Sequence, residues 1–304
     1  MTALRTLTRT IGEAEAGRTV ESVLTNELAL SKSLIRRLKR RETGILLNGA
    51  RAYTTARVRP GDVLAAEIGD DAPRALRPVP LPLVIVYEDE DLLVLDKPAG
   101  VAVHPTQDPE ETTLEHALAA YLKPGEAPHP VSRLDRGTTG LMAVAKNGYM
   151  HELLRRRLHT DAFSREYRGI CIGVPSPPAG RIALPIGLAD GSRYRRATIP
   201  GGAPSCTDYE TLVSWDAPEG RLSLLRLLPQ TGRTHQLRVH LAAIGHPLLG
   251  DWLYGNEAPE RIARPALHSA VLRLVHPLTG AVLTLRAPLP ADMAALLPPG
   301  VDAS

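Results

Sequence analysis

The segment from Pro130 to Leu141 holds the densest group of side chains that can take part in chemistry. It reads PVSRLDRGTTGL and places Asp135 between Arg133 and Arg136, ahead of a turn of small residues. A loop of this kind can hold a carboxylate near phosphate groups, where the carboxylate can act as a nucleophile or as a base. The same residue types also form ordinary surface ion pairs and turns. The segment alone leaves both interpretations open.

Two other polar residues stand in segments with clear secondary-structure signals. Tyr167 opens a stretch in which strand-forming residues dominate, and it offers a flat apolar ring with a hydroxyl group. Arg238 lies near the start of a helix predicted over 234–244, where apolar residues recur at helical spacing until Gly245. On its own, such a tyrosine is typical of a half-buried strand. A cation beside Asp135 would help to keep the carboxylate ionised.

Further elements are predicted around these residues. Apolar, β-rich runs over 83–87 and 92–95 flank an acidic turn and predict a hairpin. Helices are predicted over 113–122 and 148–158, the first capped by one of two adjacent threonines and the second by Asn147. These strands and helices must together position the loop that carries the carboxylate.

The N-terminal part of the chain is basic. Residues 1–60 hold 12 Lys or Arg residues against five Asp or Glu, a net charge of +7, whereas the remaining residues carry −4. A helix is predicted over 31–40, because Ser31 is a suitable N-cap and the apolar residues share one face. The other face is cationic and carries Lys32, Arg36, Arg37, Lys39 and Arg40. Such a face is either merely solvated or binds a polyanion.

The turns that follow this helix favour the second interpretation. A strand over 44–47 ends in the Asn48-Gly49 turn, and the turn over 59–62 precedes another strand at Val63. Together with the basic helix these signals predict a compact α+β unit that binds RNA.

Prolines mark the boundary between two parts of the chain. The segment 70–82 contains four of them, and proline favours extended backbone that cannot continue a helix. At 304 residues the chain is long enough for about two domains. We therefore predict a small domain over 1–69, a linker over 70–82 and a larger domain over 83–304.

Composition argues against several classes of protein. No apolar run approaches the roughly 20 residues that span a bilayer, and the N-terminus is too polar for a secretory signal, so a cytoplasmic protein is predicted. Cys171 and Cys206 lack CxxC spacing and are predicted to be reduced. His235 and His240 are five residues apart, unlike a helical zinc pair. We predict no metal and no nucleotide cofactor.

Several sequence blocks, taken in order, resemble one family. RLDRGTTGLMAVAKN resembles the catalytic motif of the RluA-type pseudouridine synthases, and YEDEDLLVLDKPAGVAVHP precedes it as in that family. REY, TGRTHQLRVHLAAIGHPLLGDWLYG and LHSAVLRLVHPLTG then follow in the family's order. The segment 17–68 resembles the RNA-binding domain of ribosomal protein S-four. The resemblance covers nearly the whole chain.

The resemblance implies a fold and an activity. It implies an α+β catalytic domain around a mostly antiparallel mixed sheet with flanking helices, preceded by the small α+β RNA-binding domain. It implies an enzyme that flips a uridine out of structured RNA, cleaves its glycosidic bond and rejoins the base through carbon 5. Large-subunit ribosomal RNA is the favoured substrate and transfer RNA the alternative, and the protein is expected to act as a monomer without a cofactor.

The resemblance also implies roles for individual residues. Asp135 matches the catalytic aspartate, Tyr167 the active-site tyrosine and Arg238 the arginine that pairs with the aspartate. Arg133 matches the arginine that enters the base stack when the target leaves it. Arg136 and Arg165 are expected to bind RNA, Arg165 as a supporting cation.

Two departures and two rival functions accompany the resemblance. Ser132 stands where many relatives have histidine, and Arg165 stands where they commonly have lysine. A non-catalytic RNA-binding protein could keep this architecture, although it would be free to lose Asp135, Tyr167 and Arg238. A hydrolase that cleaves base from sugar would use a similar carboxylate but would release free uracil.

Overall fold

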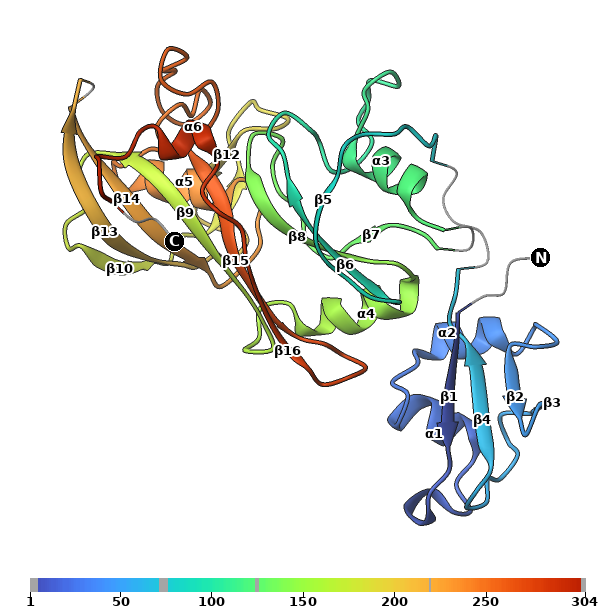
Figure 1. Ribbon diagram of the computed structural model, residues 1–304. Helices are drawn as coiled ribbons and strands as arrows, with labels where there is room; N and C mark the ends of the chain where they lie inside the picture. The colour runs from blue at the N-terminus through green and yellow to red at the C-terminus, as the bar shows by residue number, and fades with distance from the viewer. Residues whose placement is uncertain (1–4, 71–75, 124–125, 219, 302–304) are drawn as a thin grey trace.

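The computed structural model describes residues 5–70, 76–123, 126–218 and 220–301. Its strands form a four-stranded sheet near the N-terminus, a ten-stranded sheet in the rest of the chain and a separate two-stranded hairpin. The N-terminal sheet, blue in Figure 1, lies at one end of the molecule beside helix α4 (Gly148–Arg157) of the larger part.

The N-terminal unit is a small sheet with helices packed on it. Strand order is β1-β4-β2-β3, and the buried faces of two short helices complete its core. The Asn48-Gly49 turn predicted from sequence is confirmed, since both residues have left-handed φ values of 51° and 80° between β2 and β3. The elements are β1 (Thr6–Thr10), η1 (Glu13–Glu15), α1 (Val20–Asn26), α2 (Lys32–Leu38), β2 (Ile45–Leu47), β3 (Ala50–Arg51) and β4 (Val63–Glu67).

The larger unit is built on one long, curved sheet. Its main path is β10-β13-β14-β9-β15-β8-β6-β5, with β16 beside β15 and β7 beside β8. The strands are β5 (Val84–Glu88), β6 (Leu92–Lys97), β7 (His129–Pro130), β8 (Thr139–Ala145), β9 (Phe163–Ile172), β10 (Ala179–Ile182), β13 (Thr207–Ala217), β14 (Gly220–Pro229), β15 (Leu267–Val275) and β16 (Val282–Arg286). Helices α3 (Leu114–Tyr121), α4, α5 (Gln236–Ala243) and α6 (Ala291–Ala294) flank it, and β11 (Ile186–Leu188) pairs with β12 (Arg196–Thr198).

The fold class predicted from sequence is confirmed. Among the described residues every strand pair of the large sheet is antiparallel except β15 with β8, so the sheet is mixed and mostly antiparallel. Residues of β8 are buried on both faces, which explains why its sequence TGLMAVA lacks polar alternation. Strand β8 directly follows the loop that contains Asp135. A buried central strand therefore anchors the C-terminal end of that loop.

Most predicted element boundaries agree with the structure. Ser31 and Asn147 accept hydrogen bonds from backbone amides three residues on and begin α2 and α4 as expected. Other boundaries differ, since α2 ends at Leu38 instead of residue 40 and β6 continues to Lys97 beyond residue 95. Strand β9 already begins at Phe163, ahead of Tyr167. Helix α5 begins at Gln236, two residues later than predicted, because His235 takes a left-handed conformation with φ of 58°.

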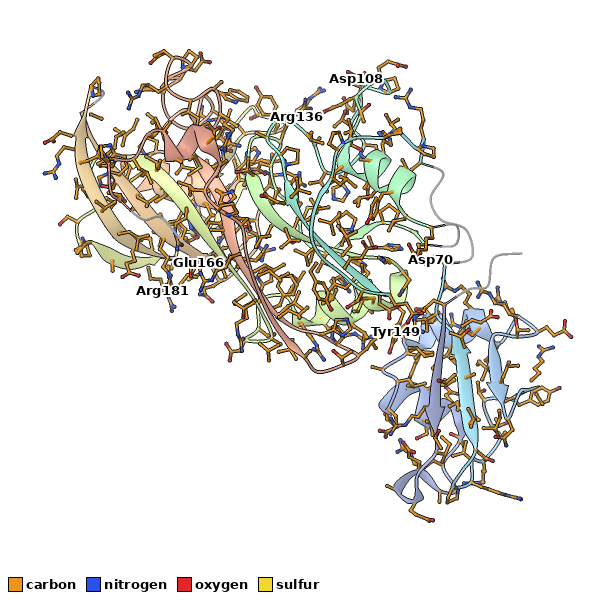
Figure 2. The ribbon with its side chains drawn as sticks, viewed as in Figure 1. Asp70, Asp108, Arg136, Tyr149, Glu166 and Arg181 are labelled. Atoms are coloured by element: carbon orange, nitrogen blue, oxygen red, sulfur yellow. The ribbon has the colours of Figure 1, made fainter. Side chains whose placement is uncertain are left out.

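The two units are in direct contact. Tyr149 and Leu153 of α4 belong to the apolar core of the N-terminal unit, and the Tyr149 hydroxyl donates a hydrogen bond to the carbonyl of Leu28. Arg5 forms an ion pair with Asp91 at 3.0 Å. Figure 2 shows Tyr149 at this boundary. Helix α4 therefore packs in the cores of both units, with Tyr149 and Leu153 in the N-terminal one and Met150 and Leu154 in the larger one.

The predicted linker lies partly outside the described residues, which omit 71–75. At its start Asp70 is fixed to the larger unit, because its carboxylate lies 2.8 Å from His129 Nε2 and accepts the Gly148 amide at 3.2 Å. Residues 76–83 have no regular secondary structure. The division into domains at this segment stays a prediction. No helix in the described part of the chain is long and apolar enough to cross a membrane.

Candidate active site

Asp135, Tyr167 and Arg238 line one cavity of about 340 Å³. Its walls come from the loop before β8, the turn after α4, strand β9 and the segment that leads into α5. These segments are far apart in sequence, but β9 and β8 both pair with β15, and α5 packs on the adjoining strands. The fold thus brings the predicted carboxylate, tyrosine and arginine together.

The loop of Asp135 is held by hydrogen bonds to its backbone. The Thr138 amide donates to the carbonyl of Asp135 at 3.0 Å and closes a turn. Gly140 then enters β8 with φ of 107°, and a Cβ at this position would lie 2.3 Å from the backbone oxygen of Ser269. Glycine is therefore required where the loop meets the sheet.

Two buried cations support the backbone just after Asp135. Lys97 is fully buried, and its Nζ donates to the carbonyls of Pro98, Val101 and Arg136 at 2.7, 3.0 and 3.2 Å. Arg264 donates from Nη1 to the carbonyl of Gly137 at 3.0 Å. Burial, with Arg264 nearby, lowers the pKa of Lys97 to about 8. The sequence analysis assigned no role to Lys97.

Arg238 is fixed by one carboxylate and faces another. Its Nε and Nη2 each lie 2.7 Å from an oxygen of Asp251, which is fully buried, and its Nη1 lies 3.4 Å from Oδ2 of Asp135. The guanidinium also lies 5.0 Å from the ring centre of Tyr254. Burial opposes the charge of Arg238, but the hydrogen bonds and charge of Asp251 raise the pKa of the guanidinium. Arg238 is therefore a permanent, oriented cation beside Asp135.

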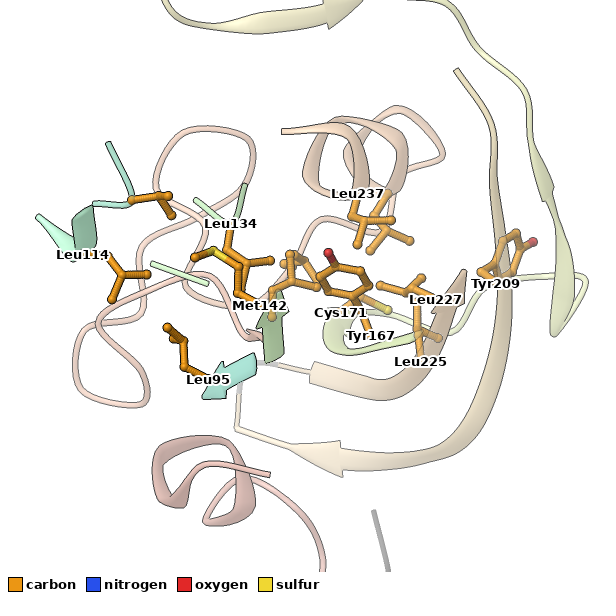
Figure 3. Packing of buried hydrophobic residues seen from close by; sticks show 14 of the residues in the cluster. Leu95, Leu114, Leu134, Met142, Tyr167, Cys171, Tyr209, Leu225, Leu227 and Leu237 are labelled. Atoms are coloured by element: carbon orange, nitrogen blue, oxygen red, sulfur yellow. The ribbon is translucent and has the colours of Figure 1, made fainter. Parts of the chain in front are cut away.

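Tyr167 forms an apolar part of the cavity wall. Its side chain is 5% exposed and belongs to the core cluster of the large sheet. Figure 3 shows its ring among Leu134 of the loop, Leu227 of β14 and Leu237 of α5. The neighbouring leucines hold this ring in place at the cavity wall.

Known proteins resemble this chain over most of its length. Residues 91–243 match the family model described as RNA pseudouridylate synthase. The chain belongs to this family. It is 36% identical over 286 residues to an uncharacterized RNA pseudouridine synthase of Bacillus subtilis (strain 168), YhcT, with 93% of each chain covered. It is also 36% identical to the ribosomal large subunit pseudouridine synthase D of Yersinia pestis, covering 96% of this chain and 93% of that one.

A solved structure gives the same result. The human RNA pseudouridylate synthase domain containing 1 matches with a TM-score of 0.57 and 29% identity, covering 68% of this chain and 83% of that chain. The resemblance to RluA-type enzymes drawn from the motifs is confirmed, and this pseudouridylate synthase is an isomerase that acts on RNA. The rival functions of a hydrolase and of a non-catalytic binding protein are not needed to explain the chain.

The predicted RNA-contacting arginines of the synthase divide into two groups. Arg133 is exposed and Arg165 half-buried, and both line the cavity. Arg136 does not line it, and its guanidinium pairs with Glu111 at 2.7 Å. A contact of Arg136 with RNA stays a prediction.

The N-terminal basic residues also differ in position. Four of these side chains are exposed, those of Lys32, Arg36, Lys39 and Arg40. Arg37 is half-buried and lines a second cavity, of about 430 Å³, between α2 and α4, together with Tyr149 and Glu152. Sequence periodicity alone does not predict that Arg37 is less exposed than its neighbours. The helix that covers it, α4, lies more than 100 residues away in the chain.

Replacing Lys97 with methionine should destabilise this synthase and slow it. The change removes the side-chain donor from the carbonyls of Pro98 and Val101 and one of two donors from the carbonyl of Arg136, which should lower the free energy of unfolding by about 3 kcal/mol. Because one of these carbonyls belongs to Arg136, turnover should fall as well. Urea unfolding and initial rates measure the two effects, and the exposed Lys123→Met is the matched control. Unchanged stability would show that Lys97 does not hold the loop.

Proposed function

We propose that this chain isomerises uridine in large-subunit ribosomal RNA and that Asp135 is its catalytic residue. The observation that carries the proposal is the pairing of Asp135 with Arg238 inside a cavity that is walled by Tyr167. The choice of RNA is supported by relatives named ribosomal large subunit pseudouridine synthase D, in Yersinia pestis and Escherichia coli O157:H7 among others.

The roles follow from the positions of the side chains. The ionised carboxylate of Asp135 attacks a carbon of the ribose or base, or removes a sugar proton, and either step begins the exchange of the glycosidic bond. Arg238 keeps the carboxylate charged while the flipped base covers it and excludes water. Tyr167 stacks on the uracil ring, and its hydroxyl assists removal of the proton at carbon 5.

RNA binding extends beyond the cavity in this proposal. The exposed cations of α2 contact phosphates, as the S-four-like sequence of the N-terminal unit suggests, while Arg165 and Arg133 contact the strand at the cavity. The protein works in the cytoplasm, where ribosomes are made, and acts as a monomer without a cofactor. Transfer RNA is the alternative substrate.

A pseudouridine map of cellular RNA tests the proposal. The map is compared between cells that carry the gene, cells that lack it and cells that carry Asp135→Asn. We expect one or more positions in large-subunit ribosomal RNA to lose pseudouridine in the last two. Loss confined to transfer RNA would replace the proposed substrate by the alternative, and identical maps would contradict the proposal.

Arg133→Ala should impair turnover more on a paired uridine than on an unpaired one. A stacked base must leave the helix at a cost of a few kcal/mol, and the guanidinium of Arg133, two residues from Asp135, can replace part of the lost stacking. We expect a loss at least about tenfold larger on a stem-enclosed target, which corresponds to about 1.4 kcal/mol.

Rates on two RNAs that differ only in the pairing of the target uridine measure this effect. Arg136→Ala is the matched control, since it removes a neighbouring arginine that lies outside the cavity. Equal losses on the two substrates would assign Arg133 to organisation of the loop instead of base flipping.

Charge reversal on α2 should weaken RNA binding and flatten its dependence on salt. Each lost phosphate contact removes about one unit from the slope of log affinity against log salt concentration. The double variant Lys32→Glu with Arg36→Glu changes two exposed residues. Deleting the unit is a poorer test, because Tyr149 and Leu153 would lose the core they pack in.

The control for this prediction reverses two exposed charges elsewhere, in Arg221→Glu with Arg286→Glu on β14 and β16. Affinity is measured over a series of salt concentrations for both double variants. If the α2 variant keeps the wild-type slope, the N-terminal unit binds something other than this RNA.

A further inference from the structure

His235 occupies an unusual backbone position beside the carboxylate. It is the residue that precedes α5, and its φ of 58° lies in the left-handed region, which costs a side chain with a Cβ atom about 1–2 kcal/mol. Such strain persists where the surroundings fix the residue, and it is concentrated at functional sites. The imidazole lines the cavity, with Nε2 at 3.9 Å from Oδ1 of Asp135.

The hydroxyl of Tyr254 lies within hydrogen-bonding distance of one nitrogen of His235. The oxygen of this hydroxyl accepts the backbone N–H of Arg196 at 2.9 Å and lies 2.8 Å from Nδ1 of His235. One lone pair of the oxygen is thereby used by the Arg196 amide, and the hydrogen of the hydroxyl is free to point at Nδ1. A hydroxyl that donates to Nδ1 leaves that nitrogen unprotonated, so that the neutral ring carries its hydrogen on Nε2.

The groups around the ring favour its neutral form. Burial lowers the pKa of His235, and the charges of Arg238 and Arg133 act in the same direction. The charges of Asp135 and Asp251 oppose them without reversing the shift. The ring therefore offers a directed N–H to the carboxylate without adding a second cation.

We infer that His235 is a positioning residue for the isomerisation: its Nε2–H, directed by Tyr254, faces Oδ1 of Asp135 while Arg238 faces Oδ2. This inference rests on the proposed catalytic role of Asp135. The two donors face different oxygens, so that hydrogen bonds from both hold the carboxylate in one orientation. The gap of 3.9 Å closes to a hydrogen bond when the base enters, as catalytic hydrogen bonds often do.

Tyr254 contacts both residues that face Asp135, Arg238 and His235. The face of its ring lies against the guanidinium of Arg238, and its hydroxyl directs His235. Tyr254→Phe therefore separates the two contributions, since it keeps the ring and removes the hydroxyl. With no donor at Nδ1, the hydrogen of the imidazole can move to that nitrogen and leave Nε2 without one.

Nitrogen NMR of the full-length protein, labelled with nitrogen-15 in its ten histidines, tests the tautomer. The signal of His235 is assigned by its loss in His235→Asn, and the other histidines serve as internal references. At neutral pH we expect the neutral Nε2–H form in the wild type and a shift toward the Nδ1–H form in Tyr254→Phe. A wild-type ring protonated at Nδ1, alone or together with Nε2, would overturn the inference.

Kinetics test whether the N–H matters for turnover. His235→Asn keeps a residue that tolerates the left-handed backbone, but its side chain is too short to bridge Tyr254 and Asp135. A hydrogen bond to a charged group is worth enough to lower kcat by about tenfold to a hundredfold, and we expect this with KM little changed. Tyr254→Phe should lower kcat by a smaller factor.

The outcomes separate this inference from the proposed function. If Asp135→Asn is inactive and His235→Asn keeps kcat within twofold of wild type, the positioning role is wrong and the function stands. If Asp135→Asn stays active, the catalytic role of Asp135 is wrong, whatever the tautomer of His235. Thermal unfolding of His235→Asn is measured in parallel, and the inference requires that kcat falls while the folded fraction at the assay temperature is unchanged.

Discussion

Asp135→Asn is expected to lower turnover more than about ten-thousandfold, as removal of the residue that begins a reaction does in other enzymes. The substitution is nearly isosteric and removes only the charge and with it the nucleophilicity of the side chain. Asp251, and not Asp135, is the main partner that holds Arg238 in place. In Asp135→Asn the guanidinium keeps both of its 2.7 Å hydrogen bonds to Asp251. The free energy of unfolding should therefore change by no more than about 1 kcal/mol.

RNA affinity and unfolding by urea are measured beside the rate. The exposed Asp216→Asn repeats the same chemical change on β13, far from the cavity lining, and should leave the rate unchanged. If Asp135→Asn keeps a rate within tenfold of the wild type, another group begins the reaction and the proposed role of Asp135 is wrong.

Arg238→Ala is expected to damage both activity and stability. Activity should fall about a hundredfold to a thousandfold, as it does when a preorganised donor to a reacting group is removed. Stability should fall by about 3–5 kcal/mol, because Asp251 is fully buried and would be left with an uncompensated charge. A simple loss of activity in this variant therefore does not separate catalysis from folding.

The double variant Arg238→Met with Asp251→Asn separates them. It removes the uncompensated carboxylate together with the cation, and it leaves an amide that can still accept the backbone N–H groups of Leu253 and Tyr254. We expect its unfolding free energy to recover most of the loss while its turnover stays low. Recovery of activity together with stability would show that Arg238 acts only on the fold and would contradict its pairing role.

Local signals in the sequence were enough to predict many elements of this fold. Ser31 and Asn147 are caps whose side chains reach the next turn of backbone, so their effect is contained within four residues. The same holds for the left-handed pair at Asn48-Gly49. The loop of Asp135 was predicted from its motif, and the family comparisons confirm the motif's family.

Contacts between distant segments could not be predicted in this way. Arg37 and Arg36 are neighbours with the same charge, yet only Arg37 lines the cavity against α4, because a helix turns its side chains through about 100° per residue. Asp251 and Tyr254 were quoted within a motif, but their contacts with Arg238 and His235 depend on how the chain returns after α5. Lys97 also lies within a block that resembles the family, but its acceptors are backbone carbonyls, which the sequence does not indicate.

Analysis of the product formed by the purified, full-length protein tests the central claim most directly. A transcript of large-subunit ribosomal RNA is incubated with wild type or with Asp135→Asn, and pseudouridine in the RNA and free uracil in solution are both quantified. We predict pseudouridine at defined positions with the wild type, none with Asp135→Asn and no free uracil with either. Release of free uracil, or equal amounts of pseudouridine with both proteins, would contradict the account.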